Sequence, residues 1–305
     1  MTRSALVFGA GGQDGHYLCQ LLRGEGVDAI AVSRGPGSSS DDAEGVRRIR
    51  GDVSKSAEVD GLMRAHEPDY VFHLAARSTT RHDAGFENHE TISTGTLNVL
   101  ESAYQYRPSA RVFITGSGVQ FRNTGEPIDE SAPFEASSLY AVARIQSVYA
   151  ARYYRSLGLR ATVGYLFHHE SPLRKAGHMS MLIAQAARRI AAGSDEKLEI
   201  GDSSVVKEWT FAGDVARAIW TLVQQDEIAE AVIGSGEGRS IAEWLDRCFS
   251  LIGRSWRDHV TLRTGFAAEY NRLVSRPTRM RALGWSPTVS FDELAAMMMK
   301  ASPAP

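Results

Sequence analysis

The stretch that decides the fold is ALVFGAGGQDG, residues 5–15. Its apolar run, Ala5–Phe8, is typical of a buried strand, and the helical spacing of the leucines that follow indicates that a helix begins after the glycine-rich turn. Gly9, Gly12 and Gly15 let the backbone approach a pyrophosphate held at the N-terminus of that helix. Because strand, turn and helix occur in the order that this mechanism requires, the stretch predicts a dinucleotide site and not merely a tight turn.

The same alternation of strand and helix patterns continues along the first half of the chain. Short runs rich in β-branched residues are separated by segments of helical periodicity, which is typical of a parallel sheet covered by helices on both faces. The sequence therefore predicts the α/β class and a doubly wound Rossmann sheet. The predicted strands are Ala5–Phe8, Asp28–Val32, Val46–Arg50, Asp69–Leu74, Arg111–Thr115 and Arg160–Phe167, and the predicted helices are Ala57–Ala65, a long helix within Glu87–Tyr106, and Ser138–Leu157.

After His168 the pattern loosens. We expect a dinucleotide-binding domain over residues 1–167 and a smaller, mostly C-terminal α/β lobe over residues 168–305, some segments of which return to the sheet. Ser33–Gly45, which is rich in glycine, serine and aspartate, is predicted to be a loop. Helices are predicted at Met179–Ala192, Gly213–Gln225 and Ile241–Ile252 and at the end of Met280–Lys300.

Composition excludes several classes of protein. The chain has 305 residues and a formal net charge of −2, with a pI near 6.5, so it lacks the positive field that attracts nucleic acid or anionic membranes. No apolar run approaches membrane-spanning length. Gly9 comes too early for the apolar region of a signal peptide, and the only cysteines, Cys19 and Cys248, lack the spacing of zinc or redox sites. We expect a cytoplasmic protein without disulfides.

The end of the second predicted strand indicates which cofactor the site prefers. A carboxylate there normally binds the ribose hydroxyls of NAD, but this chain has Ser33 and Arg34. An arginine pairs with the 2′-phosphate of NADP, so the pattern favours NADP(H), with a solvated loop arginine as the alternative. Asp52 and Val53, after the third strand, are placed to contact the adenine edge, unless Asp52 simply caps the following helix.

Three residues indicate hydride-transfer chemistry. Ser117 lies just past the fifth strand, at the carboxyl edge of the predicted sheet, and Tyr140 and Arg144 lie one turn apart on the next helix. A cation beside a tyrosine favours its phenolate form, so Tyr140 is a candidate proton donor, while the Ser117 hydroxyl is placed to hydrogen-bond the reacting oxygen. A nicotinamide would supply the hydride. Alone, a Tyr–Arg pair is more often structural, but the glycine-rich stretch favours the catalytic interpretation.

The segment Phe167–Pro172, FHHESP, follows the strand predicted after the Tyr140 helix. Its adjacent histidines, with Glu170 and His178, are residue types that bind metals, but neighbouring side chains point apart and the H-E-x-x-H spacing is absent. We therefore expect a cofactor-contacting loop and no metal site. Further along, Lys207 and Arg276 are candidates for a clamp on a nucleotide diphosphate, with surface cations as the alternative.

Over nearly the whole chain these motifs resemble the extended short-chain dehydrogenases/reductases, and specifically the GDP-mannose 4,6-dehydratase group. Leu166–Pro172 is similar to that group's Leu-Phe-Asn-His-Glu-Ser-Pro. The resemblance implies a Rossmann domain with a C-terminal nucleotide-sugar lobe, NADP as cofactor and a nucleotide-sugar substrate. The other matching segments are Gly9–Gly15, Gly51–Val53, Asp69–Val71, Leu74–Ser78, Leu283–Trp285 and Phe291–Leu294. The cofactor contacts expected beyond those above are Gln13, Asp14, Leu74, Ala75, Ala76, Ser78, Tyr140, Arg144, His169 and Arg174, and the expected substrate contacts are His168, Lys207, Glu269 and Arg276.

The departures from that family fall at the reacting groups. The family's Thr-x-Glu appears here as Ser117-Gly118-Val119, so the glutamate proposed to remove water across C5 and C6 is a valine. The lysine of Tyr-x-x-x-Lys is Arg144, which keeps the positive charge. An acid/base group typically contributes about a hundredfold or more to a rate, so the change at Val119 damages dehydration more than hydride transfer. Gln120 is no substitute, because an amide does not exchange protons as a carboxylate does. The remaining departures are His168 for asparagine and Lys207-Glu208 for Arg-Asp.

Three functions are compatible with these residues, in order of preference. The first is an NADP(H)-dependent oxidoreductase that reduces a GDP-linked 4-keto-6-deoxyhexose, the second is a GDP-mannose 4,6-dehydratase with a rearranged acid/base, and the third is a catalytically idle nucleotide-binding homologue. The resemblance also implies a homodimer in which the helices around residues 87–106 and 138–157 pair. The residues that suit such packing are Ala150, Ala151, Tyr153 and Tyr154.

Overall fold

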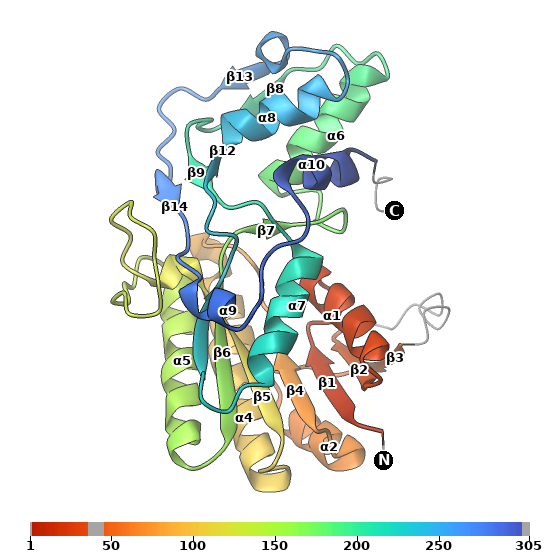
Figure 1. Ribbon diagram of the computed structural model, residues 1–305, viewed down its shortest axis with the longest axis vertical. Coiled ribbons are helices and arrows are strands. Elements are labelled where there is room, and N and C mark those ends of the chain that lie inside the picture. Colours follow the sequence, from red (N-terminus) through yellow and green to blue (C-terminus); the bar gives the residue numbers. More distant parts are fainter. Residues whose placement is uncertain (1, 36–45, 301–305) are drawn as a thin grey trace.

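A seven-stranded parallel sheet organises the protein, whose computed structural model describes residues 2–35 and 46–300 (Figure 1). The strand order is β11-β6-β5-β4-β1-β2-β3, and every neighbouring pair runs parallel, so the predicted doubly wound sheet is confirmed. Positions 36–45 of the predicted loop lie outside the described residues. The strands are β1 (Ser4–Phe8), β2 (Asp28–Ser33), β3 (Arg47–Arg50), β4 (Tyr70–His73), β5 (Arg111–Ser117), β6 (Arg160–Leu166) and β11 (Glu230–Ile233).

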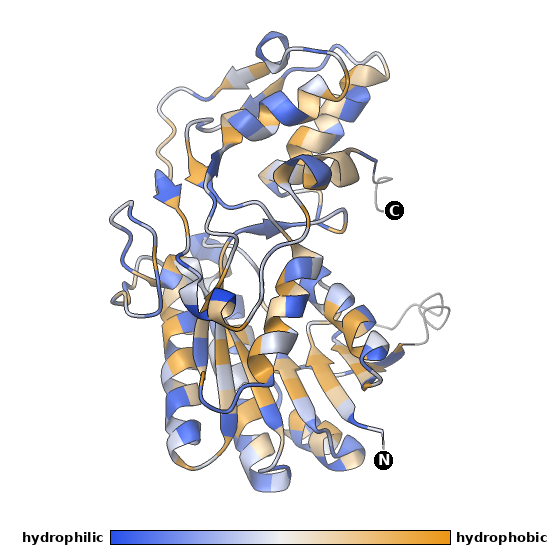
Figure 2. Ribbon diagram, viewed as in Figure 1, coloured by the Kyte–Doolittle hydropathy of each residue, from blue (hydrophilic) through white to orange (hydrophobic). Residues whose placement is uncertain are grey.

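Helices cover both faces of this sheet, which is why its strands are mostly apolar; the exception is the edge strand β3, which has three arginines in four residues. In β1, Ala5 and Val7 pack with α1 and α7, whereas the alternate residues Leu6 and Phe8 pack with α2, α4 and α5. Figure 2 shows the apolar residues concentrated in the strands of the sheet. Among the described residues, no helix is both long enough and apolar enough to span a bilayer. The helices are α1 (Gln13–Gly24), α2 (Ser56–His66), α4 (Gly95–Tyr106), α5 (Leu139–Ser156) and α7 (Ala212–Val223).

The long helix predicted within Glu87–Tyr106 is not one regular helix. A short helix, α3 (Gly85–Asn88), runs into a π-helical segment, His89–Thr94, before α4 begins. Gly95 opens α4 where the backbone comes so close to the loop after β3 that a Cβ would lie 2.9 Å from Val53 Cγ1. This segment has only six residues, fewer than the window over which apolar spacing distinguishes one kind of helix from another, so the sequence does not reveal it.

The remaining segments form a smaller lobe, except for three that return to the sheet. The helix α7 covers one sheet face, β11 pairs with β6 as the seventh strand, and the short helix α9 (Thr278–Ala282) packs on the same face through Met280. Within the lobe, α6, α8 and α10 pack around Trp209 and Trp244, whose stacked rings have centroids 4.4 Å apart. Its elements are β7 (His169–Glu170), α6 (Met179–Ala191), β8 (Leu198–Ile200), β9 (Val206–Lys207), β10 (Thr210–Phe211), β12 (Arg239–Ser240), α8 (Ile241–Ser250), β13 (Val260–Leu262), β14 (Arg272–Leu273) and α10 (Phe291–Lys300).

The α5 residues expected at a dimer interface differ in their exposure. Ala151 and Tyr154 are buried inside the subunit's own core, so the prediction is wrong for these two positions. Because they are three residues apart, both lie on the face of α5 that meets the sheet. Ala150 is half-buried, and Tyr153 is 60% exposed on the outer face.

Candidate active site

The turn between β1 and α1 is tight enough to require glycine at two positions. Gly9 has a φ of +88°, and a Cβ there would lie 2.6 Å from the Ala75 nitrogen. At Gly15 a Cβ would lie 2.6 Å from the Gly9 carbonyl oxygen. The helix α1 begins at Gln13, and no described residue caps it with a side chain, so its first N–H groups remain available to a ligand. These residues therefore fit the pyrophosphate of the predicted cofactor.

The residues predicted to contact the adenosine follow the neighbouring strands. Ser33 ends β2 and Arg34 follows it, while Asp52 and the buried Val53 follow β3. The Asp52 carboxylate accepts hydrogen bonds from the Ser54 backbone N–H at 3.0 Å and from its hydroxyl at 2.8 Å. Burial raises the pKa of Asp52, but these hydrogen bonds and the nearby Arg34 charge lower it overall. Asp52 thus braces the turn that leads into α2.

Tyr140 and Arg144 are joined on the buried face of α5. Ser138 caps this helix by accepting a hydrogen bond from the Ala141 N–H at 3.2 Å, which sets the position of the first turn. Arg144 Nε donates to the Tyr140 hydroxyl oxygen at 3.2 Å, and Arg144 Nη1 donates to the Thr115 carbonyl at 2.5 Å. Because Thr115 belongs to β5, the buried guanidinium connects the phenol to the end of that strand.

Ser117, the last residue of β5, is oriented by reciprocal hydrogen bonds with Gln120. The Ser117 backbone N–H donates to Gln120 Oε1 at 2.8 Å, and the Ser117 hydroxyl accepts from the Gln120 backbone N–H. Since accepting this bond leaves the hydroxyl hydrogen free, Ser117 is able to donate to a substrate oxygen. Gln120 is fully buried and engaged in this contact.

Val119, at the position where the family resemblance implies a glutamate, packs against an apolar cluster that includes Ile92 and Tyr140. Its own side chain has no titratable group, so this position supplies no acid or base. A cleft of about 380 Å³ opens beside Val119, and its lining includes two carboxylates, Glu135 and Glu269. The structure therefore places Glu269, an expected substrate contact, in the same cleft as Val119.

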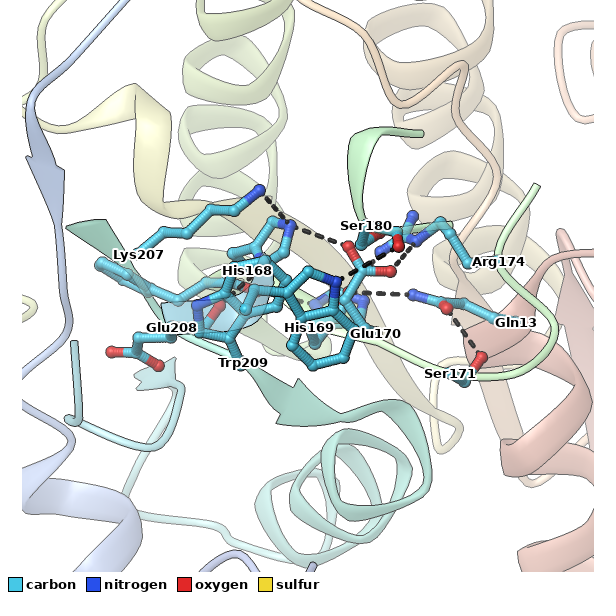
Figure 3. Close-up of polar contacts among 12 residues, drawn as sticks. Gln13, His168, His169, Glu170, Ser171, Arg174, Ser180, Lys207, Glu208 and Trp209 are labelled. Atoms are coloured by element: carbon cyan, nitrogen blue, oxygen red, sulfur yellow. Dashed lines mark hydrogen bonds and ion pairs between the residues drawn. The ribbon is translucent and has the colours of Figure 1, made fainter. Parts of the chain in front are cut away.

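A buried charged cluster gathers around Glu170, which is 1% exposed (Figure 3). Glu170 Oε1 lies 2.9 Å from His168 Nε2, and Oε2 lies 2.6 Å from Arg174 Nε. Lys207 Nζ lies 3.0 Å from the same histidine nitrogen. His168 Nδ1 lies 2.6 Å from the Glu208 carbonyl oxygen. Because a carbonyl only accepts hydrogen bonds, Nδ1 carries a proton.

Burial and charge set the protonation of this cluster. Burial raises the pKa of Glu170, but the Arg174 charge, with a further contribution from Lys207, outweighs burial and holds that pKa well below its usual range. Burial and the Lys207 charge lower the pKa of His168 to about 4. Burial also lowers the pKa of Lys207 to about 8. At neutral pH the cluster therefore combines one carboxylate and a neutral imidazole with the two cations, an excess of positive charge that suits a phosphate-bearing ligand.

The His169 side chain points away from that of His168 and connects β7 to Asp14, beside the dinucleotide turn. Its Nε2 lies 2.8 Å from Asp14 Oδ1, and its Nδ1 lies 2.7 Å from the Phe167 carbonyl oxygen. Burial lowers the pKa of His169, but the Asp14 carboxylate raises it overall. Ser171 donates to Gln13 Oε1 at 2.8 Å (Figure 3). In the described ranges, no group of three or more histidine, cysteine or acidic residues has the arrangement of a metal site.

The two residues predicted to clamp a diphosphate lie in different environments. Lys207 is 8% exposed within the charged cluster, whereas the Arg276 side chain is 57% exposed and its Nη1 lies 3.8 Å from Asp129 Oδ2. Sequence reasoning missed the central place of Glu170. The spacing of four residues between Glu170 and Arg174 is the one sequence signal for their ion pair. Lys207 is distant in the sequence, so only the fold brings it to His168 and into this cluster.

Comparisons with known proteins agree over almost the whole chain. The sequence profile of the GDP-mannose 4,6 dehydratase family matches residues 6–298. GDP-mannose 4,6 dehydratase 2 of Arabidopsis thaliana is 30% identical over 97% of this chain and 85% of its own, and the human GDP-mannose 4,6 dehydratase is 26% identical over 97% and 90%. Among solved structures, a UDP-glucose 4-epimerase from Thermotoga maritima has a TM-score of 0.86 at 20% identity, covering 98% of both chains.

The parallel sheet and these matches together define a short-chain dehydrogenase/reductase of the nucleotide-sugar-modifying epimerase/dehydratase class. Within that class, the chain belongs to the GDP-mannose 4,6 dehydratase family. The family resemblance drawn from the sequence motifs is therefore confirmed.

Proposed function

We propose that this protein is an NADPH-dependent reductase of a GDP-linked 4-keto-6-deoxyhexose. The observation that carries the proposal is the contrast at the carboxyl end of β5. Tyr140 and Arg144 are hydrogen-bonded to each other, and Arg144 also donates to the carbonyl of Thr115, two residues before Ser117, whereas Val119, at the proposed acid/base position, packs in an apolar cluster. Reduction of a ketone needs a proton donor but no group that removes the C5 proton. The names of the curated relatives support a GDP-linked hexose as the substrate class.

In the proposed reaction Tyr140 gives its hydroxyl proton to the carbonyl oxygen at C4 of the sugar, while Ser117 donates a hydrogen bond to the same oxygen. When bound, the nicotinamide cofactor supplies the hydride that reduces the carbonyl carbon. Arg144 Nε, 3.2 Å from the Tyr140 oxygen, stabilises the phenolate that remains. The balanced step converts a ketone, NADPH and one proton into an alcohol and NADP⁺.

The positions of other residues support the remaining proposed cofactor and substrate contacts. Arg34, at the end of β2, supports NADPH over NADH. His169 and Arg174 lie beside the dinucleotide turn and are proposed to contact the cofactor. Lys207 and His168 are proposed to bind the substrate diphosphate, because the cluster that they share carries excess positive charge.

We also propose a cytoplasmic homodimer. Its interface would use the outer faces of α4 and α5, where Leu97, Tyr149 and Tyr153 are 48%, 58% and 60% exposed. Both cysteines, Cys19 and Cys248, are free and buried, which suits a reducing compartment.

A 4,6-dehydratase is the second candidate, and one observation favours it. Glu135 and Glu269 line the same cleft as Val119, so a carboxylate is available near the position that lost its acid. The third candidate, an idle nucleotide-binding homologue, is motivated by the simultaneous change to Val119 and Arg144.

One experiment separates the three functions. The purified protein is given GDP-mannose with NADP⁺, and separately a GDP-4-keto-6-deoxyhexose with NADPH, while absorbance at the NADPH band and product mass are followed. Oxidation of NADPH by the ketone alone supports the reductase. Loss of water from GDP-mannose without net cofactor consumption supports the dehydratase. Cofactor binding without turnover of a broad panel of nucleotide sugars supports the idle homologue.

A further inference from the structure

Three separate segments bring charged side chains together at the carboxyl edge of the sheet. Arg34 follows β2, Arg77 lies in the segment after β4, and Glu87 belongs to the short helix α3. Glu87 Oε2 lies 2.6 Å from Arg77 Nη1, and Glu87 Oε1 lies 3.4 Å from Arg34 Nη2. One carboxylate therefore bridges two guanidinium groups that come from different strands of the sheet.

This bridge lies among the expected cofactor contacts. Arg34 is close enough to Asp52 to lower the pKa of that carboxyl, which places it at the adenosine end of the site. Arg77 lies in the sequence between Ala76 and Ser78, both of which are expected to contact the cofactor. The sequence motifs alone did not predict a function for Arg77.

The chemistry of the bridge points to a phosphate. The planar guanidinium group presents paired donors that fit a carboxylate and a phosphate oxygen pair equally well. The Arg34 and Arg77 side chains are 60% and 59% exposed, so a ligand can reach both of them. Hydrogen bonding to Arg77 lowers the pKa of Glu87, which keeps its carboxylate ionised and able to compete for the two cations.

We propose that Glu87 is an internal competitor for a phosphate of the dinucleotide, and that Arg77 is a second phosphate ligand beside Arg34. The inference rests on the NADPH-dependent function proposed above and names the residues that set its cofactor preference. The phosphate is either the 2′-phosphate of NADPH or the pyrophosphate that NADPH and NADH share. Glu87 thereby reduces the affinity that the two arginines would otherwise provide.

Calorimetric titration of NADPH and NADH tests this inference without requiring turnover. Glu87→Gln keeps the side-chain shape and removes the competing charge, so we expect NADPH to bind roughly three- to tenfold more tightly. Arg77→Met is expected to weaken NADPH binding by about tenfold. Asp83→Asn is the matched control, because Asp83 pairs at 2.7 Å with Arg81, a nearby residue of its own segment, and we expect no change in either affinity.

The two cofactors distinguish the two sources of the phosphate. Effects confined to NADPH assign the bridge to the 2′-phosphate, and equal effects on NADPH and NADH assign it to the pyrophosphate. The inference is overturned if Glu87→Gln leaves both affinities unchanged, or if it weakens NADH, which would make Glu87 a ligand of the ribose hydroxyls. Thermal unfolding of each variant verifies that it is folded. Failure of the wild-type protein to oxidise NADPH would reject the proposed function but leave these binding results decisive for Glu87.

Discussion

Replacing Glu170 by glutamine is the sharpest test of the buried charged cluster. The substitution preserves volume, so its cost isolates the charge and does not include a cavity. Glu170 is 1% exposed, and its two oxygens lie 2.6 Å from Arg174 Nε and 2.9 Å from His168 Nε2. Removing one partner of a buried pair leaves the other charge uncompensated, which costs about 3–5 kcal/mol. In the Glu170→Gln variant, both Arg174 and the neighbouring Lys207 lose the negative charge that compensates theirs.

At about 2.1 cal/mol/K per residue, the unfolding entropy of 305 residues makes each kcal/mol shift the melting temperature by about 1.6 °C, so we expect a decrease of roughly 5–8 °C. The assay is thermal unfolding, supported by urea titration. Glu199→Gln is the control, because Glu199 pairs with Arg263 at 2.9 Å while both side chains are more than half exposed. An exposed pair contributes about 1 kcal/mol or less. Equal destabilisation by the two substitutions would refute the account of a buried, interdependent cluster.

Three further predictions concern the phenol, the buried imidazole and the dinucleotide turn. Tyr140→Phe should lower the rate of NADPH-dependent ketone reduction by about a hundredfold or more while cofactor affinity, measured by calorimetry, stays within about twofold, and an unchanged rate would remove Tyr140 from the reaction. The folded pKa of His168 is about 4, below its unfolded value, so between roughly pH 6.5 and 4 the unfolded chain binds a proton that the folded chain does not, and stability falls as pH falls. Urea titrations across this range should show a shallower decline for His168→Asn, by up to about 1.4 kcal/mol per pH unit, and identical slopes would contradict the burial of a neutral imidazole. Gly9→Ala should lower the melting temperature, because its φ of +88° and a 2.6 Å approach to Ala75 disfavour any side chain, and this strain costs at least about 1–2 kcal/mol. Gly11→Ala is the matched control, since a Cβ there meets nothing within 4 Å, and equal melting temperatures for the two variants would contradict this argument.

Local patterns were sufficient to predict the sheet. Apolar runs such as Ala5–Phe8 are buried on both faces of a parallel sheet, so their composition identifies them without knowledge of their neighbours. The glycines of the dinucleotide turn are required by local backbone geometry, which a sequence expresses directly. By contrast, the π-helical segment His89–Thr94 is too short for apolar spacing to distinguish it from an α-helix, and the pairing of β11 with β6 follows from a long-range topology that periodicity does not encode.

The hydrogen-bonded pair proposed to be catalytic was also predictable from the sequence, because Tyr140 and Arg144 lie one helical turn apart on the same face of a helix. The two groups of charged residues around Glu170 and Glu87 were not predictable in this way. Glu170 meets Lys207 through His168, and Glu87 meets Arg34 and Arg77, only because parallel strands from distant parts of the chain end at one edge of the sheet. Residue type and spacing along a chain describe local geometry, whereas electrostatic pairing depends on distances in space that the packed sheet creates.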